Sequence, residues 1–193
     1  MISIKKKLPA IYVVNIEKLT GQECLFLSQF ADDYIKQRVY KNKLNKNICA
    51  MVVANVLRKF LIYKHFNIAF DKQVVDFNKN GKPFLKDCDV KFNISHSGSF
   101  VVCAISNDEI GVDIQKITPF KSKIADYIFN EKTKNEIVQS NDVDLEFTKQ
   151  WAKLESYLKL KGTGFANYDK NENRVEKHEF FYVDDYVVSV SYC

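Results

Sequence analysis

The stretch Phe100-Val-Val-Cys-Ala-Ile-Ser-Asn-Asp-Glu-Ile-Gly-Val-Asp-Ile-Gln115 decides the fold that we predict for this chain. Its first seven residues and its last six are rich in β-branched and apolar side chains, a composition typical of strands. The polar residues 106–109 between the two strands predict a boundary that divides the chain into two halves.

Each of these two strands resembles a second segment of the chain. Phe100–Ser106 is similar to Tyr186-Val-Val-Ser-Val-Ser-Tyr192, and Val112-Asp-Ile-Gln-Lys-Ile117 is similar to Val14-Asn-Ile-Glu-Lys-Leu19. Such a repeat predicts that each half opens and closes with a similar strand. Strands rich in Val and Ile also resemble one another by chance, so this alternative stays open.

Helical periodicity fills most of the sequence between the strands. Helices are predicted over residues 24–41, 45–65, 122–129, 132–139 and 144–161. Gly162 and Gly164 are expected to end the last helix. The Asn, Gly and Pro content of residues 78–83 predicts a turn, and the polar residues 170–177 are expected to precede a hairpin.

The fold class that follows is α+β, with two similar halves. Each half is expected to have a small, mainly antiparallel sheet packed on helices. We place the N-terminal half at residues 1–107 and the C-terminal half at residues 108–193. A pocket between similar halves is a common place for a ligand.

The composition is that of an ordinary soluble globular protein. The chain has 193 residues, of which 46% are hydrophobic and 27% are charged. This composition argues against disorder. The formal net charge of +5 favours an anionic partner, and a nucleic acid, a phosphorylated cofactor and an acidic protein all fit. The lysines are scattered and form no basic tail for nucleic acid.

Other features of the sequence favour the cytoplasm. No segment approaches the ~20 apolar residues that a membrane span needs. Lys5, Lys6 and Lys7 before an apolar run weakly imitate a signal peptide, but Asn15 and Glu17 end that run without a cleavage site, so a first strand is predicted. The five cysteines form no C-x-x-C pair, which predicts free thiols in a reducing compartment.

A first group of polar residues lies in Gly81-Lys-Pro83 and Phe92-Asn-Ile-Ser-His-Ser-Gly98. Lys82, at the turn that Pro83 fixes, is expected to be exposed to an anion. The hydroxyls and the imidazole of the second segment suit phosphate oxygens. The alternative is a hydrogen-bonded loop that binds no ligand.

A second group lies on the strand that begins at Ile110. Asp113 and Gln115 face the side opposite to Val112 and Ile114, because side chains alternate along a strand. A carboxylate between apolar residues is expected to lose part of its solvation and therefore to need a partner or a metal. A hydrogen bond from a backbone amide to Asp113 would also satisfy it.

A third group lies on the last predicted helix. Trp151, Glu155 and Lys159 are four residues apart and therefore share one helix face. Taken alone, Glu155 and Lys159 are also the favoured order for a surface ion pair worth ~0.3–0.5 kcal/mol.

Together and in this order, the segments resemble the Sfp-type 4'-phosphopantetheinyl transferases. The family pattern runs G-K-P, F-N-x-S-H-S, G-[IV]-D-[IVL]-E and W-x-x-K-E-[AS]-x-x-K, and the resemblance covers residues 81–164. This chain departs from the pattern at Gln115, where the family often has Glu, and at Leu154, where the family often has Lys.

The resemblance implies a pseudo-dimer of two α+β halves with coenzyme A in the cleft between them. It further implies Mg²⁺-dependent transfer of the phosphopantetheine arm to a serine of an acidic apo acyl or peptidyl carrier protein, with release of 3',5'-ADP. The implied metal ligands are Asp113, Glu155 and Gln115, and the implied catalytic residues are Glu155, Lys159 and Asp113. The implied coenzyme A-binding residues are Lys82, Pro83, Ser95, His96, Lys159, Arg38 and Lys46, where Arg38-Val-Tyr40 resembles an R-F-Y-like segment of the family.

The resemblance also implies a monomer, since the two halves would supply the whole site. Two alternatives remain. A degenerate module of the same fold would bind coenzyme A or a carrier protein without transfer, which Gln115 and Leu154 favour. A small basic RNA-binding protein would use the abundant Tyr and Phe for stacking, although no RNP-like pattern is present.

Overall fold

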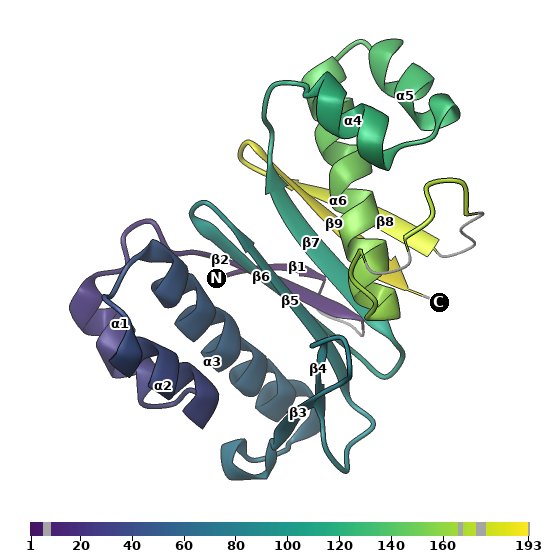
Figure 1. Ribbon diagram of the computed structural model, residues 1–193. Helices are drawn as coiled ribbons and strands as arrows, with labels where there is room; N and C mark the ends of the chain where they lie inside the picture. Colours follow the sequence, from purple (N-terminus) through teal and green to yellow (C-terminus); the bar gives the residue numbers. More distant parts are fainter. Residues whose placement is uncertain (6–8, 166–167, 173–176, 193) are drawn as a thin grey trace.

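Antiparallel sheets in the middle of the molecule and helices at its two ends make up the fold (Figure 1). The computed structural model describes residues 1–5, 9–165, 168–172 and 177–192. The elements are β1 (Ile2–Lys5), β2 (Ala10–Asn15), α1 (Gly21–Ser28), α2 (Asp33–Lys41), α3 (Lys46–Phe66), η1 (Phe70–Lys72), β3 (Val75–Phe77), β4 (Pro83–Leu85), β5 (Lys91–Ser97), β6 (Phe100–Ser106), β7 (Ile110–Lys116), α4 (Ser122–Ile128), α5 (Glu131–Val138), α6 (Val143–Lys161), β8 (Lys177–Val183) and β9 (Tyr186–Tyr192).

The two halves have the same strand order, which confirms the predicted α+β fold with two similar halves. The first sheet has the order β1-β2-β6-β5 and the second has the order β7-β9-β8. In each half the opening strand pairs antiparallel with the closing strand, which in turn pairs with its hairpin partner. Strand β1 is an addition at the outer edge of the first sheet.

The strand pairing confirms one part of the predicted repeat and corrects the other. Phe100 pairs with Asn15 and Tyr186 pairs with Lys116, so β6 and β9 are equivalent strands. The equivalent of Asn15 is therefore Lys116 and not Asp113, with which the sequence match aligns it. The sequence match between Val14–Leu19 and Val112–Ile117 is therefore shifted by three residues from the structural equivalence of β2 and β7. Strands rich in Val and Ile resemble one another in several alignments, so their similarity does not show which residues pair.

Apolar clusters hold the layers together. One face of the first sheet packs on α3, and its other face shares a core with β7 and β9 of the second sheet. Helices α4, α5 and α6 form a further cluster in the C-terminal half. Figure 1 shows α1–α3 and α4–α6 at opposite ends of the molecule, with β5 and β7 side by side between them.

The single helix predicted over residues 24–41 is wrong, because two helices occupy this segment. Helix α1 ends at Ser28, and α2 begins after the N-cap residue Asp32, whose backbone is extended. Both helices pack against α3, so the apolar pattern continues across the break and conceals it. The other predicted helices are confirmed with small shifts of their ends, and Gly162 ends α6 in a left-handed conformation at φ 65°.

The remaining predictions for the chain concern its cysteines, its last hairpin and its apolar segments. Cys24, Cys49, Cys88 and Cys103 are free thiols, while Cys193 lies outside the described residues. The hairpin expected after residue 177 is confirmed as β8 and β9, and residues 173–176 lie outside the described part. Among the helices of the described ranges, none combines the length and the apolar character that crossing a bilayer requires.

Helix α6 lies directly on β7 at Gly111. A Cβ atom at this position would overlap the carbonyl oxygen of Ser156 and the backbone nitrogen of Leu160. The hydroxyl of Ser156 also lies 2.9 Å from that of Ser189 and 2.7 Å from that of Ser191 on β9. The glycine of the motif G-V-D-I-Q therefore permits the close approach that brings Asp113 and α6 together.

We expect Gly111→Ala to lower the free energy of unfolding by about 3 kcal/mol, because a backbone of two packed elements has to move. Urea unfolding followed by circular dichroism measures the change. Gly21→Ala at the start of α1 is the control, since its Cβ would meet the movable end of the Leu44 side chain, at 3.2 Å. Equal midpoints for Gly111→Ala and the wild-type chain would contradict the close packing of α6 on β7.

Candidate active site

A cleft of about 610 Å³ lies between the two halves. Helices α2 and α3 and strands β3 and β5 line it from the N-terminal half, and β7 and α6 line it from the C-terminal half. The lining residues are Tyr34, Ile35, Arg38, Met51, Ala54, Asn55, Phe77, Ile94, Ser95, His96, Asp113, Gln115, Trp151, Glu155 and Lys159.

Asp113 is the centre of the polar contacts in the cleft. Its Oδ1 accepts hydrogen bonds from Ser95 Oγ at 2.7 Å and from Lys159 Nζ at 2.6 Å, and its Oδ2 accepts one from Gln115 Nε2 at 2.8 Å. Lys159 Nζ also donates to Ser95 Oγ at 2.8 Å. The Asp113 side chain is only 2% exposed. Its carboxylate is therefore buried with its charge paired, as its position between apolar residues predicts.

Helix α6 brings Trp151, Glu155 and Lys159 to the cleft on one face, as their spacing predicts. Burial raises the pKa of Glu155, and the nearby Asp113 carboxylate raises it further, while Lys159 lowers it. The two carboxyl groups thus lie close enough for one charge to affect the other. Glu155 is an acid that gives up its proton less readily than an ordinary glutamate.

His96 lies at the mouth of the cleft on β5. Partial loss of solvation lowers the pKa of His96, the Lys159 ammonium lowers it further, and the Asp113 carboxylate opposes both effects. The imidazole is therefore neutral at pH 7 and can accept a hydrogen bond through one ring nitrogen and donate through the other.

Four of the predicted coenzyme A-binding residues line the cleft, namely Arg38, Ser95, His96 and Lys159, and the other three do not. Lys82 and Pro83 line a neighbouring pocket of about 240 Å³ that shares Glu155 and Lys159 with the cleft. Lys46 Nζ donates to Ser99 Oγ at 3.0 Å, in the turn between β5 and β6.

The side chain of Lys82 holds the two halves together. Lys82 Nζ pairs with Glu109 at 2.7 Å and donates to the carbonyl oxygen of Leu160 in the last turn of α6 at 2.9 Å. Asn80 Nδ2 donates to the carbonyl oxygen of Gly162 at 2.9 Å. The turn between β3 and β4 thus caps the helix that carries Glu155 and Lys159, and an ammonium at a helix C-terminus is favourable.

Sequence reasoning missed the wall that the N-terminal half contributes. Tyr34 and Phe77 meet edge to face there, with ring centroids 5.3 Å apart. Met51 and Asn55 of α3 are four residues apart and line the same wall. Helical spacing within α2 and α3 could have grouped these residues, but it does not indicate which face of a helix meets the other half of the protein.

The cleft offers oxygen donors that suit Mg²⁺. The Asp113 and Glu155 carboxyl groups line it, and the Gln115 amide nitrogen already donates to Asp113, which leaves the amide oxygen as the atom for an ion. Carboxylate and carbonyl oxygens, together with waters and substrate phosphates, form the usual surroundings of Mg²⁺. Within the described residues, no group of three or more His, Cys, Asp or Glu side chains is placed to hold a metal. Two acids and one amide leave most of the Mg²⁺ coordination positions open, so this set fits Mg²⁺ only if a phosphorylated substrate or water supplies the other ligands.

Models of known protein families match both halves of the chain. A family model described as 4'-phosphopantetheinyl transferase, N-terminal, matches residues 20–108. A second model, described as 4'-phosphopantetheinyl transferase superfamily, matches residues 109–185. Together the two models cover most of the chain, including every residue that lines the cleft.

Curated relatives carry the same name. The 4'-phosphopantetheinyl transferase Sfp of Bacillus subtilis (strain 168) is 34% identical over 167 residues, which span 81% of this chain and 71% of that protein. The 4'-phosphopantetheinyl transferase gsp of Aneurinibacillus migulanus is 41% identical over 115 residues, spanning 56% of this chain and 46% of that protein. The L-aminoadipate-semialdehyde dehydrogenase-phosphopantetheinyl transferase of Xenopus laevis is 30% identical over 150 residues, spanning 68% of this chain and 49% of that protein. The chain therefore belongs to the Sfp-type 4'-phosphopantetheinyl transferase family.

Proposed function

We propose that this protein moves the phosphopantetheine arm of coenzyme A to a serine of an apo acyl or peptidyl carrier protein, in a reaction that depends on Mg²⁺. The observation that carries the proposal is the meeting of Asp113, Glu155 and Lys159 in the cleft between the halves. The names of the relatives support the same reaction.

The reaction is attack of the carrier serine oxygen on the β-phosphorus of coenzyme A. A new P–O bond forms, the pyrophosphate P–O bond breaks, and 3',5'-ADP leaves. Mg²⁺ held by Asp113, Glu155 and Gln115 would neutralise charge on the phosphate oxygens. Lys159 places an ammonium beside the leaving phosphate, and the neutral His96 offers it a hydrogen bond. Glu155 accepts the serine proton, directly or through a water.

Charge and composition support the choice of partner. The net charge of +5 suits a carrier protein with acidic helices. Such complementarity mainly speeds the encounter, so the rate of transfer is expected to fall as salt is added. Further parts of the proposal are a monomer, a cytoplasmic location, coenzyme A bound by Arg38, Ser95, His96 and Lys159 in the cleft, and Lys82, Pro83 and Lys46 as further contacts at its edge.

The test is to incubate the protein with coenzyme A, Mg²⁺ and several apo carrier proteins and to weigh each carrier by mass spectrometry. Addition of one phosphopantetheine mass to a carrier is expected. Binding of coenzyme A with no mass added to any carrier would contradict transfer and favour a binding module without catalysis.

We expect Gln115→Glu to keep transfer within a few-fold of the wild-type rate and to lower the half-saturating Mg²⁺ concentration by about tenfold. The new carboxylate would face the Asp113 oxygen that the Gln115 amide now contacts at 2.8 Å. Without metal, the variant should therefore be less stable than the wild-type chain, and Mg²⁺ should restore its stability. Transfer rates over a range of Mg²⁺ concentrations and melting temperatures with and without Mg²⁺ check both effects. Loss of transfer at saturating Mg²⁺ would show that the amide donor itself is needed.

A further inference from the structure

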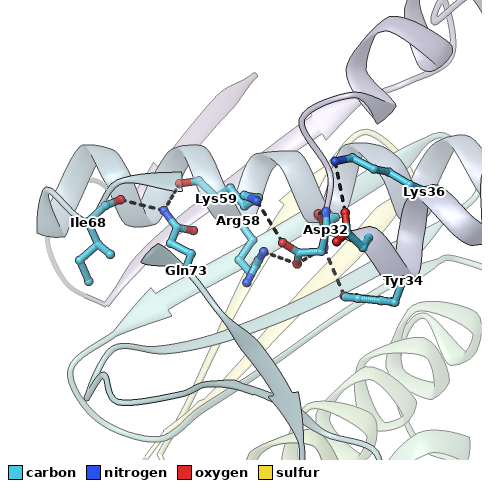
Figure 2. A network of polar contacts seen from close by, with 9 residues as sticks. Asp32, Tyr34, Lys36, Arg58, Lys59, Ile68 and Gln73 are labelled. Carbon is cyan, nitrogen blue, oxygen red and sulfur yellow. Dashed lines mark hydrogen bonds and ion pairs between the residues drawn. The ribbon is translucent and has the colours of Figure 1, made fainter. Parts of the chain in front are cut away.

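Asp32 is the N-cap residue of α2, but its side chain does not cap the helix. An aspartate at this position ordinarily accepts a hydrogen bond from a backbone N–H of the first turn. The Asp32 carboxylate points to α3 instead, as Figure 2 shows, and the charged ends of Arg58 and Lys59 point toward it.

Three side chains of α3 bind this one carboxylate. Arg58 Nη2 donates to it at 2.6 Å, Lys59 Nζ at 3.0 Å and Asn55 Nδ2 at 2.9 Å. Asn55 Oδ1 in turn accepts the backbone N–H of Asp32 at 2.9 Å. The side chains of Asp32, Arg58 and Lys59 are 13%, 1% and 10% exposed, so these charges interact with little screening by water.

The α3 end of these contacts is fixed from the other side. Gln73 Nε2 donates to the carbonyl oxygens of Lys59 and Ile68 at 2.9 Å each, a contact that Figure 2 also shows. The Arg58 guanidinium lies 5.1 Å from the ring centre of Phe92 on β5. The partners of Asp32 on α3 are therefore held in place by other contacts, and a displacement of Asp32 would break its hydrogen bonds with them.

The other contacts of helix α2 with α1 and α3 are mainly apolar, with Tyr34 and Val39 partly buried against the same cluster as Ile35. Among its residues only Ile35 is buried. Burial of one such side chain contributes about 2 kcal/mol and, being non-directional, does not set the rotation or the tilt of a short helix. The directional contacts of Asp32 at the start of α2 supply that restraint.

The same helix forms part of the cleft wall. Tyr34, Ile35 and Arg38 line the cleft from α2. Asn55 Nδ2, which binds Asp32, also donates to Tyr34 Oη at 3.2 Å. A shift at Asp32 would thus reach the aromatic ring and the guanidinium that α2 presents to the cleft.

We propose that Asp32 is a positioning residue, which sets Tyr34 and Arg38 in the cleft wall through its contacts with Asn55, Arg58 and Lys59 and so determines the affinity for coenzyme A. This inference rests on the proposed function, because it takes coenzyme A as the ligand of the cleft. Asp113, Glu155 and Lys159 lie on other elements, so Asp32 acts on binding and not on the chemical step.

The kinetic test compares Asp32→Asn with Asp33→Asn. Asp33 is the next residue, its side chain is 91% exposed, and it pairs with Lys36 at 3.4 Å, so its variant is the matched control. For Asp32→Asn we expect KM for coenzyme A to rise about tenfold with kcat within about threefold, and for Asp33→Asn neither to change. A role through charge alone predicts the opposite sign, because loss of Asp32 adds net positive charge near the cleft and would lower KM. An unchanged or lowered KM, or a fall in kcat at constant KM, would overturn the proposal.

A second measurement reports on α2 itself. Hydrogen exchange followed by mass spectrometry should show faster exchange at residues 33–41 in Asp32→Asn, with α6 unchanged, and no difference in Asp33→Asn. If Asp32→Asn does not fold, Asp32→Glu decides: it keeps the charge but displaces the carboxylate by one methylene, and its KM should rise about threefold at unchanged kcat. A wild-type KM and wild-type exchange in a folded Asp32 variant would refute the positioning role.

A binding assay tests the role of Asp32 independently of the transfer reaction. Trp151 is the single tryptophan of the chain and lines the cleft, so its fluorescence reports on coenzyme A without any transfer. If the wild-type protein binds coenzyme A but transfers nothing, the proposed function fails while the dissociation constants of the two variants still test Asp32. If the wild-type protein does not bind coenzyme A at all, both fail.

Discussion

Glu155→Gln is expected to abolish transfer and at the same time to stabilise the metal-free protein. The loss of transfer should be on the order of 10³-fold, because the side chain is proposed both to hold Mg²⁺ and to accept the serine proton. The gain in stability follows from the raised pKa of Glu155, whose charge is unfavourable in the cleft beside Asp113.

The sign of the pH dependence follows from the same shift. The pKa of Glu155 is higher in the folded chain than in the unfolded chain, so the folded state binds more protons in the interval between the two values. The free energy of unfolding therefore falls as pH rises through this interval, and above it the ionised carboxylate costs its full amount. At pH 7.5 the glutamine variant, which carries no charge, should have the higher urea midpoint without metal.

The measurements are urea unfolding at pH 7.5 with and without Mg²⁺, and the mass-shift assay. Addition of Mg²⁺ with coenzyme A should stabilise the wild-type chain and stabilise Glu155→Gln much less. Glu146→Gln on the same helix is the control, since Glu146 pairs with Lys149 at 2.6 Å and does not line the cleft. Near-normal transfer by Glu155→Gln at controlled Mg²⁺ would remove Glu155 from the mechanism.

Asp113→Asn is expected to abolish transfer as well, but to destabilise the protein. The Asp113 carboxylate accepts hydrogen bonds from Ser95, Gln115 and Lys159. An asparagine accepts through one oxygen only, and its amide would face a donor. The free energy of unfolding should therefore fall by about 1–3 kcal/mol while the fold persists. The exposed part of Lys159, 29% of its side chain, keeps the cost below that of a fully buried broken ion pair.

Asp185→Asn is the matched control for this variant. Asp185 pairs with Lys116 at 3.3 Å in the same half, but both side chains are more than half exposed, so the change should be within about 1 kcal/mol. Transfer rates and urea midpoints of the two variants check the prediction. A loss of stability in Asp113→Asn and a gain in Glu155→Gln, with transfer lost in both, would show that the charge of Asp113 is paired and that the charge of Glu155 is unfavourable in the folded protein. A rise in the urea midpoint for Asp113→Asn would contradict this assignment.

The parts of the site that lie on one element were predictable from the sequence. Trp151, Glu155 and Lys159 share a face of α6 because their spacing matches the helical turn. Asp113 and Gln115 share a side of β7 because side chains alternate along a strand. Each prediction needs only the local geometry of one element, which neighbouring elements do not change.

The parts of the site that depend on packing between elements were not predictable. The contacts of the Lys82 ammonium with Glu109 and with the carbonyl oxygen of Leu160 at the end of α6 have no sign in the sequence, since Leu160 lies 78 residues further along the chain. The break at Asp32 was missed because α1 and α2 both pack on α3 and keep one apolar pattern. The contact of Gly111 with Ser156 and Leu160 likewise has no local sign beyond the glycine itself.

The amino-acid sequence by itself determined four of the helices, the strands β2, β6, β7 and β9, the resemblance between the two halves and the family motifs, because periodicity and turn preference act over a few neighbouring residues. Only the tertiary structure decided that Asp113 meets Ser95 and Lys159, that Tyr34 and Phe77 form the opposite wall of the cleft, and that Asp32 holds α2 on α3. The physical reason is that these partners lie tens of residues apart along the chain, so their meeting depends on how whole sheets and helices pack.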